Sequence, residues 1–424
     1  MRAAGESGRR WPGPPPRRTG CGGPGTRRWS CGWLGGSRHD PRGTPRWPRR
    51  PRARDQSAAH DVVRRAVAAG CQEPRAVAAR FDGLPVTPPT LPAAECVALD
   101  VGGANLKAAD GRGWCHAGRF ELWRRRSELV TAIADLLAAG PSAGCVVATM
   151  TGEIADCFES RAEGVQSIVE AVVAAAAGRP VGIYLVDGSI VDPALAIARP
   201  LEAAASNWHA TARLAASVAG PGEAVLVDVG STTSDLVRIV DGEPRPRGLC
   251  DVARMATGEL VYTGVERTPV AAVAAAVPWR GRLQPLSSER YAESRDVWML
   301  LGGLAPDPAD SSTADGRPAT LDGARRRLAR MLLADPEELP MAEAIVAAEA
   351  VAAAQARQLV EALVAVSPPA TVILAGHGGC LARRAIRQLG WDCRLVDLAE
   401  VVGPAAARVA PAEALARIAL GTLR

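Results

Sequence analysis

Two short segments of this chain place a carboxylate at the end of an apolar run and follow it at once with small residues. The first spans residues 99–107 and the second spans residues 227–235. A tight turn of small residues points backbone N–H groups at one spot, which suits phosphate oxygens, and glycine lets the backbone approach closely. The residues expected to bind phosphate there are Gly102, Gly103, Ala104, Asn105, Gly230, Ser231, Thr232 and Thr233.

The aspartates of these segments are candidate metal ligands, because hard cations such as Mg²⁺ prefer oxygen atoms. We expect Asp100 and Asp228 to lie on the metal side of the site, with Asp235 as a third ligand. One such turn is weak evidence, since tight hairpins use glycine for steric reasons alone. Two turns 128 positions apart (Asp228 minus Asp100) favour two related domains that face each other across a phosphate-binding cleft.

Lys107 follows the first turn and is the only lysine among the 50 basic residues; the other 49 are arginine. A GC-rich coding bias replaces lysine wherever arginine serves equally well. A position that keeps lysine indicates a need for a compact, flexible ammonium group, although one lysine can also survive by chance. We expect Lys107 to bind a phosphate group as a point charge.

A third segment, residues 372–380, reads as a strand, a glycine-rich turn and the start of a helix. That arrangement suits an anion or a nucleotide, and Gly376, Gly378 and Gly379 are its expected phosphate-binding residues. It is not a dinucleotide fingerprint. His377 in this turn is either catalytic or an ordinary turn residue with a local hydrogen bond.

Strands and helices alternate from about residue 95 onward, which predicts an α/β fold. The expected strands are 96–101, 114–123, 144–150, 181–187, 224–229, 234–240, 371–375 and 393–397. The expected helices are 128–139, 162–177, much of 193–219, 322–334, 341–366, 380–389 and 411–420. Each half opens with an apolar strand that ends in Asp-Val-Gly. We therefore divide the chain into a leader and linker (1–92), a first domain (93–220) and a second domain (221–424).

The formal charge of +5 hides a difference between leader and body. Residues 1–92 hold 18 Arg and 6 acidic residues, while the rest holds 32 basic and 39 acidic residues, so the body is acidic. The leader is rich in Arg, Pro, Gly and Trp, and we expect it to be disordered. A misplaced translation start is the interpretation we favour for it. The alternative is single-stranded nucleic-acid binding by arginine and tryptophan.

Composition excludes several classes of protein. No run of 18 apolar residues occurs, so a membrane-spanning helix is not expected. The ten cysteines form no CxxC pair and no zinc ligand set, and a chain this long does not need disulfides. We expect reduced thiols and a cytoplasmic location.

The three segments together resemble the phosphate and adenosine motifs of the actin/Hsp70/sugar-kinase superfamily. Lys107 departs from that pattern, because many members carry a smaller residue there, and ATP use is left open. Further segments make a narrower resemblance. They are residues 148–158 followed by 163–165, then 255–259 and 262–269, and 314–320 leading to 325–331. Together they look like the hydantoinase/oxoprolinase-related family of tetrahydromethanopterin-linked one-carbon transfer proteins. The resemblance runs from about Cys96 to the C-terminus.

This resemblance implies a transferase of methanofuran or methylofuran assembly with a two-domain actin-like fold. The enzyme would join an aminomethylfuran-methyl diphosphate to a tyramine- or tyrosine-type phenol and release pyrophosphate. Lys107 would hold the diphosphate, with Mg²⁺ on Asp100 and Asp228. Its partners would be these two small molecules; no membrane is implied, and the oligomeric state is left open, with a homo-oligomer as one option.

Five other residues are candidates for the acceptor side of this reaction. Glu153 and Asp156, which we place near the start of a helix, are expected to act as the base or to bind the cationic amine. Glu153 could equally be a first-turn acid of that helix, and Thr151 could be its N-cap instead of a substrate ligand. Arg267 and Thr263 are expected to contact the second substrate, unless Arg267 forms an ordinary ion pair. We expect Arg325, Arg326, Arg327 and Arg330 to form a solvated helix face.

Three alternatives stay open from the sequence. An ATP-dependent kinase of the same superfamily would use the phosphate and adenosine motifs in the usual way. A hydantoinase-type hydrolase would need ATP or metal constellations that the sequence does not reveal. A scaffold that binds pathway partners, or an RNA-binding leader, would need no catalysis.

Overall fold

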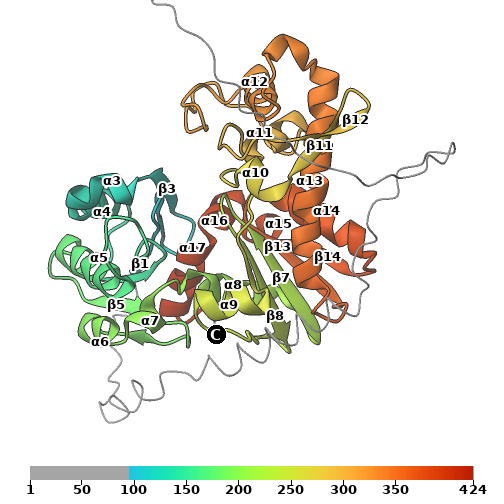
Figure 1. Cartoon of the computed structure of the whole chain (residues 1–424). Helices are drawn as coiled ribbons and strands as arrows, with labels where there is room; N and C mark the ends of the chain where they lie inside the picture. Colours follow the sequence, from blue (N-terminus) through green and yellow to red (C-terminus); the bar gives the residue numbers. More distant parts are fainter. Residues whose placement is uncertain (1–94, 424) are drawn as a thin grey trace, which may run out of the picture. The chain divides into compact units, whose positions relative to one another are not determined.

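The computed structural model describes residues 95–423 (Figure 1). The leader and linker expected over 1–92 lie outside the described residues. Two mixed β-sheets form the framework, one built from residues before 192 and the other from residues after 222. The expected α/β fold with two similar halves is confirmed.

The first sheet has six strands in the order β3–β2–β1–β4–β5–β6. Its centre is β1 (Cys96–Val101), which pairs antiparallel with β2 and parallel with β4. Every residue of β1 is buried, as expected for an apolar strand covered on both faces. The other strands are β2 (Asn105–Ala109), β3 (Cys115–Arg119), β4 (Cys145–Met150), β5 (Val181–Tyr184) and β6 (Ile190–Val191).

The second sheet repeats this arrangement in the order β10–β8–β7–β13–β14. Its central strand β7 (Glu223–Val229) pairs antiparallel with β8 and parallel with β13, as β1 pairs with β2 and β4. Its other strands are β8 (Ser234–Val240), β9 (Glu243–Pro244), β10 (Leu260–Val261), β13 (Thr371–Ala375) and β14 (Arg394–Asp397). The duplicated topology is the one expected of the actin/Hsp70/sugar-kinase superfamily.

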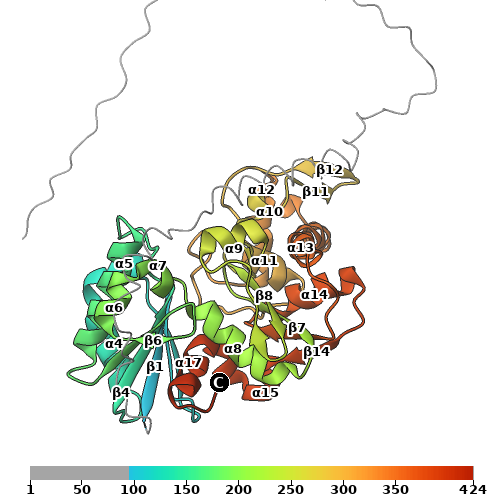
Figure 2. The ribbon, with the colours of Figure 1, turned by 90° about the horizontal axis from the view of Figure 1, so that it is seen from below.

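Helices cover both faces of each sheet, and two of them form a shared layer (Figures 1 and 2). α17 packs on the first sheet, α8 packs on the second, and the two helices contact each other. The change from the first sheet to the second falls between Val191 and Glu223, but α8 already packs on the second sheet and the C-terminal helix α17 packs on the first. The main helices are α4 (Leu129–Ala138), α5 (Arg161–Ala175), α8 (Asn207–Ala219), α11 (Ser294–Leu300), α12 (Leu321–Met331), α13 (Met341–Leu363), α14 (Gly379–Leu389) and α17 (Ala410–Ala419).

Shorter elements complete the fold. They are α3 (Leu122–Arg125), α6 (Pro193–Ala198), α7 (Pro200–Ala203), α9 (Asp251–Thr257), α10 (Val270–Val273), α15 (Leu398–Val402), α16 (Pro404–Arg408), the hairpin strands β11 (Ala276–Trp279) and β12 (Arg282–Pro285), and 3₁₀ turns at Arg126–Glu128 and Pro336–Glu338. Among the described residues, no helix combines the length and the apolar character that crossing a membrane requires.

Strand alternation decides which way the motif aspartates point. In β1, Cys96 and Ala98 belong to the core cluster around α8 and α17, whereas Val97 and Leu99 belong to the cluster with α4 and α5. Because successive side chains point to opposite faces, Asp100 lies on the α17 side. By the same alternation in β7, Asp228 continues the face of Ala224 and Leu226, which share that cluster. Both aspartates therefore belong to the sheet faces that the α8–α17 layer covers.

Two sequence expectations were wrong. The strand expected over 114–123 stops at Arg119, and α3 follows because the Leu122 N–H bonds the Gly103 carbonyl of the first turn at 2.9 Å. The expectation of a solvated arginine face was also wrong at Arg327, which has no exposed surface. Its guanidinium bonds Asp296 and Asp315 from two other segments, and such partners are invisible in a local sequence pattern.

Candidate active site

The two aspartate hairpins have the same local geometry. In the first turn, Gly102 donates its N–H to the Asn105 carbonyl at 3.0 Å, and in the second, Gly230 donates to the Thr233 carbonyl at 2.9 Å. Each aspartate lies directly across its hairpin from the residue seven positions later, Lys107 opposite Asp100 and Asp235 opposite Asp228. The repeat predicted from the sequence is thus a repeat in three dimensions.

Backbone carbonyls of both turns accept hydrogen bonds from neighbouring segments of the chain. In the first, Gly103 and Ala104 accept N–H groups from the segment 120–122. In the second, Gly230 and Ser231 accept N–H groups from Val265, Glu266 and Arg267 at 2.9–3.1 Å. In a trans peptide the N–H group points away from the carbonyl, so the N–H groups of these peptides point away from the residues that bind the carbonyls.

Within residues 95–423, the N–H groups of Gly103, Ala104, Ser231 and Thr232 have no acceptor in the protein. Each turn therefore has fixed carbonyls and free N–H groups. A concavity lined by backbone N–H groups is suited to an anion, and above all to phosphate.

Lys107 and Asp100 form an ion pair at the end of the first hairpin, with 3.1 Å between Nζ and Oδ2. The lysine side chain is 28% exposed and the aspartate side chain 3%, so the ammonium group has access to solvent that Asp100 lacks. The other carboxylate oxygen of Asp100 is buried and has no hydrogen-bond partner among residues 95–423. An orphan oxygen of this kind can accept a cation or a water molecule.

Asp228 is where the three motifs meet. Burial raises the pKa of Asp228 to about 6, and the nearby Asp235 and Asp100 carboxylates add to the rise, while Lys107 and His377 oppose it. Lys107 and Asp100 come from the first motif and His377 from the third, so all three motifs act on one carboxylate. The spacing of the motifs in the sequence suggested that they meet, and the structure brings them together at Asp228.

The third motif lies against the second turn. The Gly378 N–H donates to the Val229 carbonyl at 2.9 Å. Gly376 has a φ of +72°, and a Cβ there would meet Val229 O at 2.2 Å and Asp228 Oδ1 at 2.6 Å. Only glycine permits this approach. Gly379 begins α14 in open space.

The Asp235 carboxylate is already paired with another side chain of the protein. Arg254, which is 1% exposed, donates to its Oδ1 at 2.8 Å and lies 3.9 Å from the centre of the Trp208 ring. Burial raises the pKa of Asp235, and Arg254 opposes that rise. Among residues 95–423, no three His, Cys, Asp or Glu side chains come close enough together to hold a metal ion. The three expected metal ligands thus do not form a complete protein cage.

Glu153 lies in the turn after β4 and is 1% exposed. Neither of its carboxylate oxygens has a hydrogen-bond partner among the described residues. Burial raises its pKa to about 7, and the Asp251 carboxylate adds to the rise while Arg161 opposes it. The expectation that Glu153 and Asp156 sit at a helix start was wrong, because α5 begins at Arg161.

The cap of that helix is Ser160, whose hydroxyl accepts the Glu163 N–H at 3.2 Å. Thr151 is therefore not an N-cap. Its N–H donates to the Val101 carbonyl at 3.0 Å, beside the first turn. Asp156 is exposed in the same segment.

Thr263 and Arg267, the two residues of the second half expected to contact the acceptor, differ in solvent exposure. Thr263 is fully buried, and its hydroxyl accepts a hydrogen bond from Gln355 at 3.0 Å, so it lies behind the second turn. Arg267 is exposed, with its guanidinium 5.6 Å from the centre of the Trp123 ring. That contact joins a residue anchored to the second turn with a residue of α3, which starts at the first.

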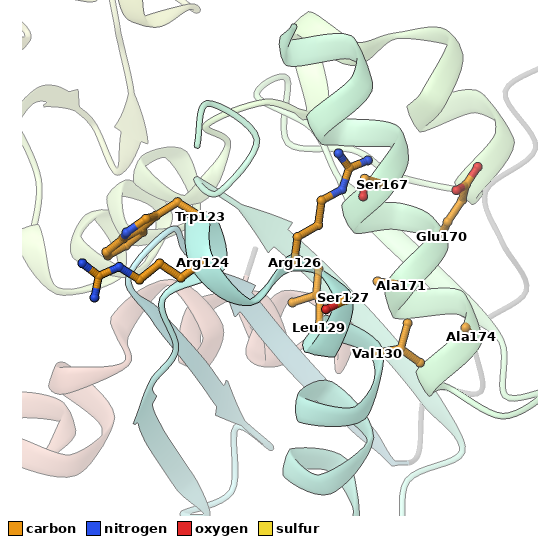
Figure 3. Close-up of a pocket in the computed structure, with 10 residues that line it drawn as sticks. All are labelled: Trp123, Arg124, Arg126, Ser127, Leu129, Val130, Ser167, Glu170, Ala171 and Ala174. Atoms are coloured by element: carbon orange, nitrogen blue, oxygen red, sulfur yellow. The ribbon is translucent and has the colours of Figure 1, made fainter. Parts of the chain in front are cut away.

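A hollow of about 700 Å³ lies beside this contact, between α3, α4 and α5 (Figure 3). Trp123 and Arg124 lie at one end of it, and Glu170 lies at the other. None of the residues of the three motifs lines it. We therefore place the candidate active site at the turns and not in this hollow.

A family model described as hydantoinase/oxoprolinase matches residues 132–419. The chain belongs to the hydantoinase/oxoprolinase family. The match contains the second and third motifs and begins after the first. The resemblance seen in the sequence is therefore confirmed.

Two curated relatives carry the same name, (4-{4-[2-(gamma-L-glutamylamino)ethyl]phenoxymethyl}furan-2-yl)methanamine synthase. The protein from Methanocaldococcus jannaschii is 34% identical over 242 residues, which cover 56% of this chain and 72% of the relative. The protein from Methanococcus vannielii is 31% identical over 121 residues, which cover 28% of this chain and 54% of the relative.

Solved structures of similar fold include a ROK family glucokinase from Streptomyces griseus, with a TM-score of 0.41 and 16% identity over 76% of this chain and 99% of the other. Another is the activator of 2-hydroxyisocaproyl-CoA dehydratase from Clostridium difficile, with a TM-score of 0.38 and 10% identity over 77% of this chain and 95% of the other.

Two charged residues of this hydantoinase/oxoprolinase chain escaped the sequence reasoning. Arg254 neutralises Asp235, and Glu266 accepts a hydrogen bond from His377. Arg254 lies directly before the segment 255–259 and Glu266 lies inside the segment 262–269, and the resemblance assigned no role to either residue. Only the pairing across the fold distinguishes them from surface charges.

Proposed function

We propose that this protein joins an aminomethylfuran-methyl diphosphate to the phenol of a tyramine- or tyrosine-type acceptor in methanofuran or methylofuran assembly. An aryl ether forms and pyrophosphate leaves. The observation that carries the proposal is the convergence of Lys107 and the third motif on Asp228. The N–H groups of the two equivalent turns, which have no acceptor among the described residues, add to it. The name of the curated relatives, which describes a phenoxymethyl-furan product, supports it.

The main task of the protein in this reaction is to stabilise a leaving group. Negative charge grows on the diphosphate as its bond to the methylene carbon breaks. Fixed N–H groups and the Lys107 ammonium would lower the energy of that charge without reorganisation. The furan ring stabilises positive charge on the carbon, so positioning of the two substrates supplies most of the remaining catalysis.

Mg²⁺ fits this site as a companion of the diphosphate. Mg²⁺ in such sites typically binds one or two carboxylates together with substrate phosphates and water, so a three-residue cage is not required. Asp100, with its orphan buried oxygen, and Asp228, crowded by other carboxylates, are the residues that would hold it. Asp235, which is paired with Arg254, would influence the Asp228 carboxylate electrostatically. When bound, the ion would neutralise charge on the leaving group.

The acceptor would bind on the Arg267 side of the turns. Arg267 is exposed and could pair with a carboxylate of the phenolic substrate. Thr151 lies beside the first turn, within reach of either substrate. Asp156 follows it and is exposed, and we assign it to the cationic aminomethyl group, which needs a carboxylate partner. Glu153, at 1% exposed, would act on that group only from beneath the surface. We propose that the reaction takes place in the cytoplasm.

The test uses the purified full chain with Mg²⁺. One arm supplies aminomethylfuran-methyl diphosphate with tyramine, tyrosine or their γ-glutamyl forms, and measures pyrophosphate release together with the mass of the ether product. The other arm supplies ATP with the same acceptors and measures ADP. We expect ether and pyrophosphate in the first arm, and about 10- to 100-fold slower formation of both in Lys107→Ala. ADP in the second arm without any ether in the first would overturn the proposal in favour of a kinase.

A further inference from the structure

His377 lies in the third turn with its imidazole held by a carboxylate. Its Nε2 is 3.0 Å from Glu266 Oε1, and the side chain is 48% exposed. An ionised carboxylate only accepts hydrogen bonds, so Nε2 carries the proton and Nδ1 is left as the basic nitrogen. A histidine oriented by an acid in this way is the usual arrangement of a protein base.

Glu266 is itself fixed from three sides. Its N–H donates to the Ser231 carbonyl of the second turn at 3.1 Å. Its second carboxylate oxygen accepts a hydrogen bond from Arg295, which also pairs with Asp310. Although burial acts in the opposite direction, His377 and Arg295 hold the pKa of Glu266 at about 2. The acid thus stays ionised at every pH at which an enzyme of this kind would work.

The imidazole also lies close to the proposed diphosphate site. Gly376, the residue before it, lies against the Asp228 carboxylate, and His377 in its protonated form acts electrostatically on that carboxylate together with Lys107. The acidic groups near the imidazole are Glu266, from the segment after β10, and Asp228, from β7. Glu153, with 1% of its surface exposed, has no comparable access to a substrate hydroxyl.

We propose that His377 is the base that removes the phenol proton of the acceptor, and that Glu266 is its positioning residue. This inference rests on the proposed function. The proton moves from the phenol oxygen to Nδ1 of His377, and the oxygen forms its bond to the methylene carbon. The carbon–oxygen bond to the diphosphate breaks, and its electron pair leaves with pyrophosphate. The imidazolium then returns its proton to water.

The experiment compares two phenols in the full chain with Mg²⁺. One is tyramine, and the other is a ring-fluorinated tyramine, whose more acidic phenol needs less help from a base. His377→Gln should lower kcat for ether formation with tyramine by about 100-fold or more, the usual contribution of a positioned base. The loss should shrink to less than about tenfold with the fluorinated phenol.

His116→Gln is the matched control, because it makes the same change on an exposed histidine of β3. His116 pairs with Ala108 and so points to the opposite face of the sheet from Lys107. We expect wild-type rates with both phenols. Glu266→Gln keeps a hydrogen-bond acceptor but removes the charge, and it should lower kcat while leaving KM for the diphosphate unchanged. Glu266→Asp should recover part of the loss.

Three results would overturn the base assignment. One is a wild-type rate in His377→Gln. Another is an equal loss with both phenols, which would mean that His377 binds or orders the turn. The third is a rise in KM for the diphosphate with kcat unchanged in Glu266→Gln. If the wild-type chain itself makes no ether, the proposed function fails, and that outcome is distinct from the other three.

Discussion

Lys107 and Asp235 occupy the same position in two equivalent hairpins, each directly opposite the motif aspartate of the neighbouring strand. The first hairpin thus pairs Asp100 with a cation, whereas the second pairs Asp228 with another carboxylate. Arg254 compensates the second pair from α9, at 2.8 Å from Asp235. The duplicated fold therefore has one hairpin with a solvent-accessible ammonium group and one with concentrated negative charge. This asymmetry suits a diphosphate on one side and a cation on the other.

Replacing Lys107 by alanine should lower kcat/KM for the diphosphate by about 10- to 100-fold, the effect of losing one hydrogen bond to a charged group. It should also destabilise the fold by about 1–3 kcal/mol, because the buried Asp100 carboxylate loses its partner. Steady-state kinetics and denaturant unfolding measure the two effects.

The double variant Lys107→Ala with Asp100→Asn separates these effects. It removes the unpaired charge, so stability should return while activity stays low. Recovery of activity in the double variant would show that the lysine serves only to neutralise Asp100. Lys107→Arg should restore stability without full activity, since a planar guanidinium does not reproduce a point charge.

Glu153 should make stability fall as pH rises. Its pKa is about 7 in the fold, above the ordinary value of 4.5, so the folded state holds a proton that the unfolded state releases. Stability is highest below the unfolded pKa and is lost between about pH 4.5 and 7. Glu153→Gln should therefore stabilise the protein at pH 8, by on the order of 3 kcal/mol, and have little effect at pH 4.

Thermal unfolding at a series of pH values measures this difference. Glu159→Gln is the matched control, because Glu159 is an exposed acid in the same segment, and it should leave the pH profile unchanged. A Glu153→Gln profile parallel to that of wild type would show that the Glu153 carboxylate is not buried in solution.

Gly376→Ala should destabilise the site by more than about 1–2 kcal/mol, the cost of a left-handed conformation for a residue with a Cβ. The added atom would also meet Val229 O at 2.2 Å. The control is Gly379→Ala three residues later, where a Cβ meets nothing within 4 Å. Chemical denaturation of both variants tests this, and equal midpoints would contradict the close approach of the third turn to Asp228.

Arg327→Ala should destabilise the fold by about 3–5 kcal/mol, because it leaves the buried Asp296 carboxylate without its partner. The neighbouring Arg326 is 53% exposed and pairs with Asp322 on the same helix. Arg326→Ala should therefore change stability by no more than about 0.5 kcal/mol. A small loss of stability in both variants would mean that the Asp296 carboxylate becomes protonated or pairs with another residue when Arg327 is removed.

Much of the fold could be predicted from the sequence, because strands such as Ser234–Val240 and Thr371–Ala375 are continuous apolar or alternating runs between turn residues. The second motif hairpin was predicted for the same reason, whereas the strand Asn105–Ala109 that completes the first hairpin was not among the expected strands. Strand alternation is a local property, so the sequence could predict which residues of one strand share a face. Which residue lies opposite each aspartate depended on the register of the hairpins.

Only the tertiary structure decided what those residues meet. Glu153 is buried because its backbone lies against Gly164 of α5, and not because of its neighbours in the sequence. Arg327 and Arg326 are adjacent and chemically identical, yet one is buried on Asp296 and the other is exposed. The pairing of His377 with Glu266 joins residues 111 positions apart (377 minus 266). Such contacts depend on how the elements pack, and a local pattern carries no information about partners that distant segments supply.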